Sequence, residues 1–140
     1  MNKVAVVYWS GTGNTEAMAK AVLQGIQEKG AEGELFSCEQ FNADMVKNYD
    51  ALAFGCPAMG DEALEDTVFE PMFNACSDQL KGKKVALFGS YGWGVGDWMK
   101  NWEEQCEGAG IRLAEDSVIC NDKPNDEAIL QCKELGAALA

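Results

Sequence analysis

Residues 4–15 form the stretch Val4-Ala5-Val6-Val7-Tyr8-Trp9-Ser10-Gly11-Thr12-Gly13-Asn14-Thr15, in which an apolar run leads into a glycine loop rich in hydroxyl groups. The apolar run is typical of a buried strand, and the residues after the loop have the spacing of an amphipathic helix. The two glycines let the backbone approach a ligand closely, and the free N–H groups of a helix N-terminus favour an anion. The stretch therefore predicts a strand, a phosphate-binding loop and a helix.

The loop offers neutral donors for this phosphate. They are the side chains of Ser10, Thr12, Asn14 and Thr15. No Lys or Arg lies between Lys3 and Lys20, so the lysine of nucleotide-hydrolysing loops is missing. Glu16 stands where a dinucleotide-binding fingerprint has its third glycine, which disfavours NAD. The alternative is an ordinary strand-to-helix turn, but helix capping explains one such donor and not four.

The length and charge of the chain limit its domain organisation and its partners. At 140 residues, the chain is expected to form one domain over residues 1–140. Its 11 basic and 23 acidic residues give a net charge of −12. This excess of negative charge argues against nucleic acids and anionic membranes as partners and favours basic proteins.

The cysteine and histidine content restricts the chemistry. The six cysteines never occur as Cys-x-x-Cys, and the chain has no histidine. Both facts argue against zinc and iron–sulfur centres, so no metal site is expected and the cysteines are interpreted as structural thiols of a reducing compartment. With no charged-then-apolar leader and no apolar run of membrane-spanning length, the sequence predicts a cytoplasmic protein. Without histidine, ordinary nucleophilic triads are excluded, and redox work would require a cofactor.

Apolar runs of strand length alternate with segments of helical spacing along the whole chain. Strands are predicted at about 3–9, 33–38, 51–56, 84–90 and 112–120, and helices at about 13–29, 42–47, 68–80, 96–109 and 125–139. The strands at 3–9, 51–56 and 84–90 are almost continuously apolar, as expected where helices cover both faces of a parallel sheet. The last strand is more polar and is expected at an edge. The fold class is therefore α/β, with a doubly wound parallel sheet.

Two further loops follow predicted strands at their carboxyl ends. They are Cys56-Pro57-Ala58-Met59-Gly60-Asp61-Glu62 and Ser90-Tyr91-Gly92-Trp93-Gly94. In an open parallel sheet, ligands bind outside these strand ends, so the three loops are expected to converge on one ligand. Met59, Tyr91 and Trp93 beside flexible glycines suit a flat apolar ring, although Trp93 alone could equally cap the core under a loop.

With these three loops, the chain closely resembles a short-chain flavodoxin, over its whole length, of the type found in anaerobic bacteria. The first loop resembles the family's FMN-phosphate loop, and the other two resemble the loops on either side of its flavin ring. The resemblance implies a five-stranded sheet in the order 2-1-3-4-5 with helices on both faces, and FMN as the cofactor.

The resemblance also implies which residues bind FMN. Ser10, Thr12, Asn14 and Thr15 would hold the phosphate together with the amides of Gly11 and Gly13. Pro57 and Ala58 would lie near the ribityl chain, and Met59 and Trp93 would flank the ring. Glu62 would accept from flavin N3–H, and backbone amides around Gly92 would reach the pyrimidine oxygen. The remaining expected contacts are Gly60, Asp61, Ser90, Tyr91, and, as weaker candidates at the ring's edge, Asn121 and Asp122.

One turn of the second loop carries a more detailed expectation. Gly60 and Asp61 are placed at the centre of a turn from Met59 to Glu62, beside flavin N5. A flip of the peptide between them would turn a carbonyl toward N5 when that atom gains a proton. The flip requires a positive φ first at Asp61 and then at Gly60, which glycine allows freely.

By resemblance, the chain is a low-potential one-electron carrier and not an enzyme. It would cycle mainly between the neutral semiquinone and the anionic hydroquinone and shuttle electrons between redox enzymes in place of ferredoxin. The acidic residues near the ring would make the anionic form harder to reach; they are Asp61, Glu62, Glu65, Asp66 and Glu70. Each of these alone is expected to be a solvated surface charge, and their collective field would steer a monomer onto basic patches of partner oxidoreductases.

Two other functions are possible on a similar fold. An FMN-dependent NAD(P)H quinone or flavin reductase would need room for a second substrate over the ring, whereas Met59 and Trp93 are expected to occupy both ring faces. A response-regulator receiver domain would need an acidic cluster after the first strand and an Asp after the third, where this chain has Ser10 and Cys56. The sequence therefore favours the carrier.

Overall fold

The computed structural model describes residues 2–60, 62–92 and 94–140, and within these residues the chain forms one parallel sheet of five strands. The strands are β1 (Lys3–Tyr8), β2 (Glu32–Ser37), β3 (Ala51–Gly55), β4 (Lys84–Tyr91) and β5 (Val118–Asn121). Their spatial order is β2-β1-β3-β4-β5, with Val7 of β1 paired to Phe36 on one side and to Phe54 on the other. The predicted fold class and strand order are confirmed.

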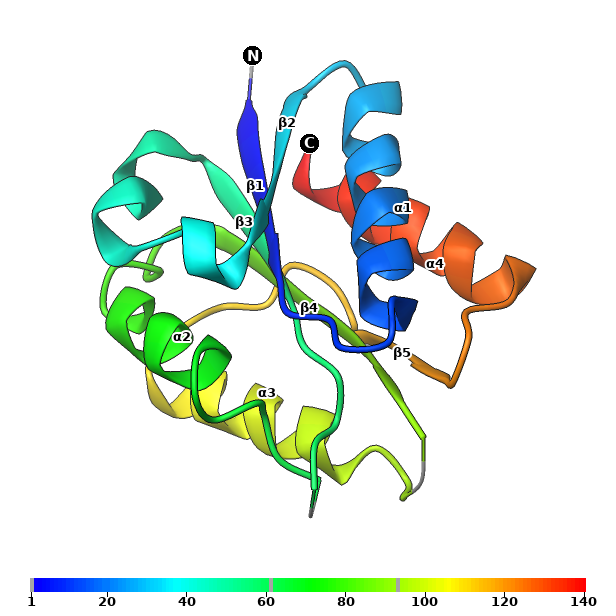
Figure 1. Cartoon of the computed structure of the whole chain (residues 1–140). Helices are drawn as coiled ribbons and strands as arrows, with labels where there is room; N and C mark the ends of the chain where they lie inside the picture. Colours follow the sequence, from blue (N-terminus) through cyan, green and yellow to red (C-terminus); the bar gives the residue numbers. More distant parts are fainter. Residues whose placement is uncertain (1, 61, 93) are drawn as a thin grey trace.

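Helices cover both faces of the sheet (Figure 1). One face carries α1 (Asn14–Glu28) and α4 (Asp126–Leu139), and the other carries α2 (Phe69–Ser77) and α3 (Asp97–Gly108). Two short 3₁₀ helices, η1 (Cys38–Gln40) and η2 (Ala43–Asn48), stand where one short helix was expected. The start of α4 is fixed by its N-cap, because the Asn125 side chain accepts from the amide of Ala128 at 2.8 Å.

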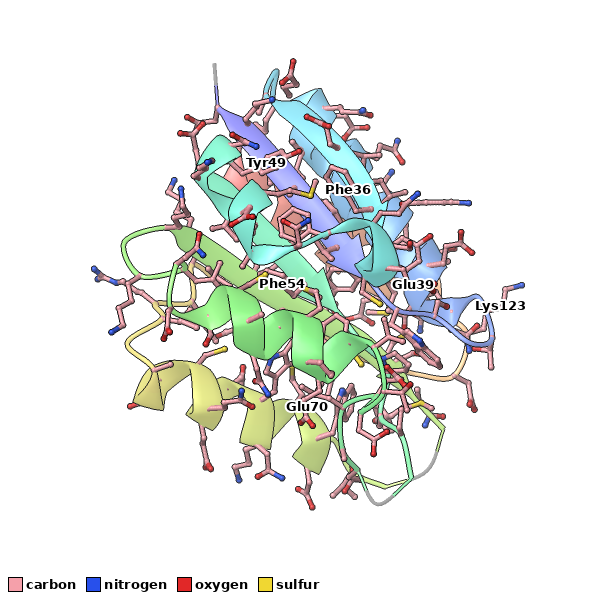
Figure 2. All side chains as sticks on the ribbon, turned by 60° about the vertical axis from the view of Figure 1, so that its left-hand side comes forward. Phe36, Glu39, Tyr49, Phe54, Glu70 and Lys123 are labelled. Carbon is pink, nitrogen blue, oxygen red and sulfur yellow. The ribbon has the colours of Figure 1, made fainter. Side chains whose placement is uncertain are left out.

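The core under α2 and α3 is rich in aromatic rings. Phe54 of β3 meets Phe73 of α2 edge to face, with ring centroids 5.0 Å apart, and Trp102 of α3 contacts Phe69 in the same way at 5.5 Å. Phe36 lies beside Tyr49 farther along this face, and Phe54 lies beneath α2 (Figure 2). Such edge-to-face pairs add to the stabilisation from apolar burial.

The core under α1 and α4 is built differently, because the two helices approach each other through glycines. A Cβ atom on Gly25 of α1 would lie 2.0 Å from the carbonyl oxygen of Lys133, and one on Gly136 of α4 would lie 2.0 Å from that of Val22. Only a residue without a side chain fits at either position. The two helices therefore pack backbone against backbone.

The last strand differs from the prediction of a continuous strand over 112–120. Leu113 pairs with Val85 of β4, but the ladder resumes only where Val118 pairs with Phe88. Five steps along this segment thus match three steps along β4, and the extra residues leave the sheet. The polar residues of this segment explain the departure, because Glu115 and Asp116 become exposed to solvent and the Ser117 hydroxyl donates to the Glu103 carboxylate at 2.6 Å. As predicted, β5 is an edge strand.

All six cysteines are free thiols, and five are buried. Burial raises the pKa of Cys38 and Cys76 to about 11 and that of Cys106 and Cys132 to about 12, so these thiols stay protonated. This agrees with their interpretation as structural thiols. In the described part of the chain, no helix has the length and apolarity of a membrane span.

Candidate functional site

The loop between β1 and α1 is folded around the hydroxyl group of Ser10. Its Oγ accepts from the backbone amide of Gly13 at 3.0 Å and from that of Glu16 at 3.3 Å. Gly13 precedes α1 with a φ of +96°, a left-handed conformation that glycine adopts without strain. Because both amides point at Ser10, its hydroxyl hydrogen is directed away from them and is available to a ligand.

The start of α1 presents further donors. Among the residues that the structure describes, the backbone amides of Thr12, Asn14 and Thr15 donate to no acceptor. Such amides, together with the positive end of the helix dipole, form a site for an anion. Thr15 itself is 1% exposed, and its hydroxyl pairs with that of Ser90 at the end of β4 at 3.1 Å. This contact joins the first loop to the third.

The second loop folds as a small hairpin. Met59 and Ala63 exchange two backbone hydrogen bonds of 2.8 and 3.0 Å, so three residues separate the paired positions. The turn is therefore one residue wider than the expected turn from Met59 to Glu62, because pairing to Ala63 closes it. The positive φ values fall on Gly60, at +50°, and on Glu62, at +53°. Asp61, the other expected centre of the turn, lies outside the described residues.

The third loop is fixed to the neighbouring strand ends. Trp98 of α3 donates from Nε1 to the carbonyl oxygen of Cys56 at 3.0 Å, and its ring packs on Tyr91 with centroids 5.5 Å apart. Asn121 donates from Nδ2 to the carbonyl oxygens of Tyr91 and Gly92, at 3.3 and 3.2 Å. The expected ring neighbour Trp93 lies outside the described residues.

The three loops enclose one cavity of about 230 Å³ at the carboxyl ends of β1, β3 and β4. Its described lining consists of Trp9, Gly11, Thr12, Asn14, Pro57, Ala58, Met59, Ser90, Tyr91, Gly92 and Asp122. None of these residues is basic, so a bound phosphate would meet neutral donors. The cavity has an apolar lining beside a polar end, which fits a flat ring that carries a phosphate chain.

Several predicted site residues lie beside this cavity without lining it. Ser10, Gly13 and Thr15 make hydrogen bonds within the first loop or to its neighbour Ser90. Gly60 and Glu62 belong to the hairpin turn, and Asn121 holds the backbone of the third loop. Trp9 lines the cavity although its position in the first loop did not make it a candidate. Its ring packs against Gly11, where a Cβ atom would lie 3.1 Å away. The sequence did hold a sign of this role, because Trp9 is an aromatic residue directly after a buried strand, at the strand end where ligands bind.

Glu62 makes an unexpected contact with α3. Its Oε1 accepts from the backbone amides of Val95 at 3.2 Å, and of Gly96 and Asp97 at 3.0 Å each. These amides form the start of α3, so a residue of the second loop caps a helix that follows the third. For a side chain other than glycine, the left-handed backbone of Glu62 costs about 1–2 kcal/mol.

Glu65 is not a solvated surface charge, and this corrects the expectation for the acidic cluster. It is 6% exposed, and its carboxylate accepts from the amides of Val68 and Phe69 at 2.8 Å, the amide of Thr67 at 3.0 Å and the Thr67 hydroxyl. Burial opposes its ionisation, but the Thr67 hydroxyl and the three amides outweigh burial and hold its pKa at about 2. Glu65 is thus a charged cap at the start of α2.

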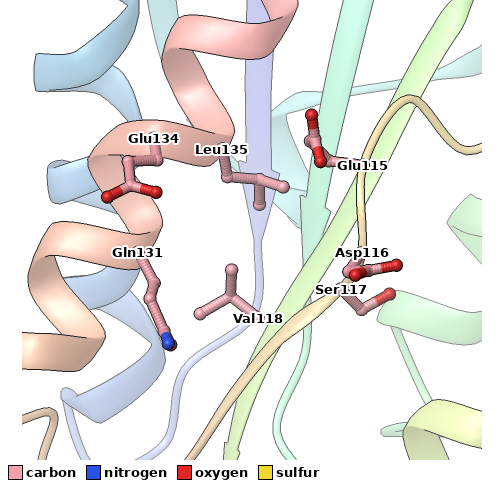
Figure 3. Close-up of a pocket in the computed structure, with 7 residues that line it drawn as sticks. All are labelled: Glu115, Asp116, Ser117, Val118, Gln131, Glu134 and Leu135. Carbon is pink, nitrogen blue, oxygen red and sulfur yellow. The ribbon is translucent and has the colours of Figure 1, made fainter.

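A larger hollow of about 340 Å³ lies elsewhere, between α4 and the segment that leads into β5 (Figure 3). Gln131, Glu134 and Leu135 of α4 line one side, and residues 115–118 line the other. Three carboxylates surround it, and it is remote from the strand ends where the loops converge. In the described residues, no three His, Cys, Asp or Glu side chains are placed to hold a metal ion.

Comparisons with known proteins agree with this architecture. Residues 6–136 match the family model described as flavodoxin. The chain is 47% identical to the flavodoxin of Megasphaera elsdenii over 98% of both chains, and 47% identical to that of Clostridium beijerinckii over 96% of this chain and 97% of the relative. The solution structure of the two-electron reduced Megasphaera elsdenii flavodoxin superimposes with a TM-score of 0.89 at 49% identity, over 97% of each chain. With its strand order and its three converging loops, the chain belongs to the flavodoxin family.

Proposed function

We propose that this chain is a low-potential one-electron carrier that shuttles electrons between redox enzymes in place of ferredoxin. Flavodoxins are FMN-binding electron-transfer proteins, and FMN is the cofactor of this chain. The finer proposal is that the bound FMN cycles mainly between the neutral semiquinone and the anionic hydroquinone. The observation that supports it most is the cavity where three loops meet, with neutral donors at one end and, among its described lining, Asp122 as an acidic residue and no basic one.

The proposed FMN contacts follow the three loops. The phosphate would take the free amides of Thr12, Asn14 and Thr15 and the hydroxyl of Ser10. The ribityl chain would pass Pro57 and Ala58, and the ring would lie between the second and third loops, against Met59 and Tyr91. FMN supplies the electron-accepting ring, while the protein holds it, orients it and limits its contact with water.

The charge of the protein supports a low second potential. Asp122 lines the cavity, and the hairpin turn and the segments after it carry Glu62, Asp66 and Glu70. Negative charges near the ring destabilise the anionic hydroquinone and so lower the second potential. A lower second potential makes the fully reduced protein a stronger electron donor. The same charges would steer the protein onto basic patches of partner oxidoreductases, with an affinity that falls as salt rises.

The remaining parts of the proposal concern the state of the protein. We propose one domain, a monomer in the cytoplasm, with no nucleic-acid or membrane partner. The net charge of −12 supports this, because it repels phosphate-rich surfaces and keeps copies of the chain apart.

The principal alternative is an FMN-dependent NAD(P)H quinone or flavin reductase. It is disfavoured because the described lining of the cavity has no basic residue for the phosphates of a second nucleotide. Mixing the FMN-loaded protein with NAD(P)H alone separates the two functions. Direct bleaching of the flavin would favour the enzyme.

The decisive experiment is a reductive titration of the purified protein with its cofactor bound, combined with mass spectrometry of the cofactor extracted from a separate sample. We expect one FMN per chain and two separate one-electron steps, the second at much lower potential. Extraction of FAD, or reduction in one two-electron step, would overturn the proposal.

A further inference from the structure

We propose that the free edge of β5, together with the segment 115–117 that precedes it, is a docking site for an extended, basic segment of a partner protein. The partner segment would pair with this edge as an added strand beside β5. Its hollows share no lining residue with the cavity between the three loops, so the site would hold a partner without covering that cavity. The inference goes beyond the proposed function, because the pairing needs no FMN.

The backbone of residues 115–117 carries hydrogen-bonding groups for this pairing. In the part of the chain that the structure describes, none of the three amides donates to an acceptor and none of the three carbonyl oxygens accepts. The ladder with β4 stops at Ala114, whose amide donates to the carbonyl oxygen of Val85 at 2.8 Å, and resumes at Val118. Because β5 is the last strand of the sheet, its outer edge is unpaired as well. An exposed edge of this kind is a template for an added strand.

Hollows on both sides of this segment give room to the side chains of an added strand. One is the hollow of about 340 Å³ against α4, which Ser117 lines (Figure 3). The other, of about 510 Å³, lies against α3 and is lined by Glu103, Glu107 and residues 110–113. It adjoins the same segment, because Glu103 accepts from the Ser117 hydroxyl at 2.6 Å. Successive side chains of a strand point to opposite faces, so an added strand would place them alternately in the two hollows.

The charge around these hollows identifies the occupant. Their lining holds the carboxylates of Glu103, Glu107, Glu115, Asp116 and Glu134 against the single basic side chain of Arg112. A segment with lysine or arginine side chains fits this field, and its affinity should fall as the salt concentration rises. A second copy of this chain does not fit, because it would bring carboxylates together and each copy has a net charge of −12.

The probe is a blocked octapeptide that repeats Lys-Lys-Thr-Thr, so that lysines lie on both faces of a strand. A second peptide is N-methylated at its threonines, which keeps the charge but removes hydrogen-bond donors from both of its edges. Each peptide is titrated into the FMN-loaded protein at low salt. NMR follows the amide shifts and the hydrogen exchange of residues 115–121.

Two double variants separate the local charge from the total charge. Glu115→Gln with Glu134→Gln removes two charges beside the edge of β5. The matched control, Glu39→Gln with Asp44→Asn, removes two exposed charges from the segments that follow β2, the strand at the opposite edge of the sheet. Neither control carboxylate has a hydrogen-bond or ion-pair partner among the described residues.

We expect the first peptide to bind, to shift the amide signals of residues 115–121 and to slow the exchange of at least one amide of residues 115–117 about 10-fold. The N-methylated peptide should bind about 10-fold more weakly. The variant at Glu115 and Glu134 should bind the first peptide about 5- to 10-fold more weakly, and the control variant within about 2-fold of the parent.

Four results would overturn the proposal. They are no binding of the first peptide, equal affinity of the two peptides, equal losses in the two double variants, and shifts confined to the loops around the cavity. A dimer of the protein alone, with shifts at residues 115–121, would also overturn it, since the occupant of the edge would then be a second copy of this chain.

Discussion

The buried carboxylate of Glu65 should contribute a pH-dependent part of the stability. Replacing it by glutamine keeps its size but turns one acceptor oxygen into a donor. The four donors at the start of α2 are three backbone amides and the Thr67 hydroxyl, and glutamine can serve only the pair that faces its remaining oxygen. The variant therefore leaves buried donors without an acceptor, and an unsatisfied buried donor costs more stability than a hydrogen bond removed together with both its partners.

The magnitude follows from the pKa. In the folded protein it lies at about 2, against an ordinary value of 4.5, and each unit corresponds to about 1.4 kcal/mol. The full difference would be about 3 kcal/mol, and screening by water at the protein surface reduces the expectation to about 2 kcal/mol. Because the folded pKa is lowered, this stabilisation is complete above about pH 4.5 and is lost as the pH falls toward 2.

The assay is denaturant unfolding of the parent and Glu65→Gln, each without FMN, between pH 7 and pH 2.5. The difference in free energy of unfolding should be about 2 kcal/mol at pH 7 and should shrink steadily below pH 4.5. A difference that stays constant across this range would refute the reasoning, since the effect would then come from packing and not from charge.

Three further predictions concern the phosphate loop, the hairpin turn and the helix contact. Thr12→Ala should weaken FMN binding by about 1–3 kcal/mol and leave the potentials nearly unchanged; unchanged affinity by calorimetry would exclude Thr12 as a ligand. Gly60→Thr should lower the first potential and the semiquinone yield. The expected cost of about 1–3 kcal/mol comes from the backbone alone, because φ is +50° and a Cβ at Gly60 would collide with no atom within 4 Å. An unchanged first potential would rule out the redox-linked turn. Gly25→Ala should lower the free energy of unfolding by about 1–3 kcal/mol or more, because its Cβ would collide with the Lys133 carbonyl oxygen. The control Gly108→Ala places a Cβ in open space on α3, so it should leave the stability unchanged or raise it. Equal unfolding free energies of these two alanine variants would contradict the backbone contact.

The sequence predicted the strands that are buried on both faces, because such strands show continuous apolar runs. It failed for 112–120, where apolar residues flank Glu115 and Asp116, and where only the pairing with β4 decides which residues remain in the sheet. The order of apolar and polar residues along the chain does not determine how residues 113–118 pair with β4.

The site was predicted in a similar way. The residues that line the cavity follow strand ends, and topology brings strand ends together. Glu62 was expected to accept from the flavin ring and Glu65 to be a surface charge near it, and neither was expected to cap a helix. The amides that Glu62 accepts from lie 33 to 35 residues away, so spacing along the chain gives no sign of its capping role. Glu65 caps amides only two to four residues ahead of it, so its role was open to a local reading of the sequence. The width of the turn after Met59 likewise depends on its pairing with Ala63.

The close contact between α1 and α4 has a consequence for biosynthesis. The three loops around the cavity, together with Asp122, precede α4 in the chain, so they leave the ribosome first. At that moment Ala53 of β3 and Phe88 of β4, on the sheet face that α1 and α4 cover, are still without the apolar side chains of α4. A nascent chain that already carries the three loops around the cavity thus lacks one of the two helices that cover this face of the sheet, and we expect FMN to bind only after α4 has been translated.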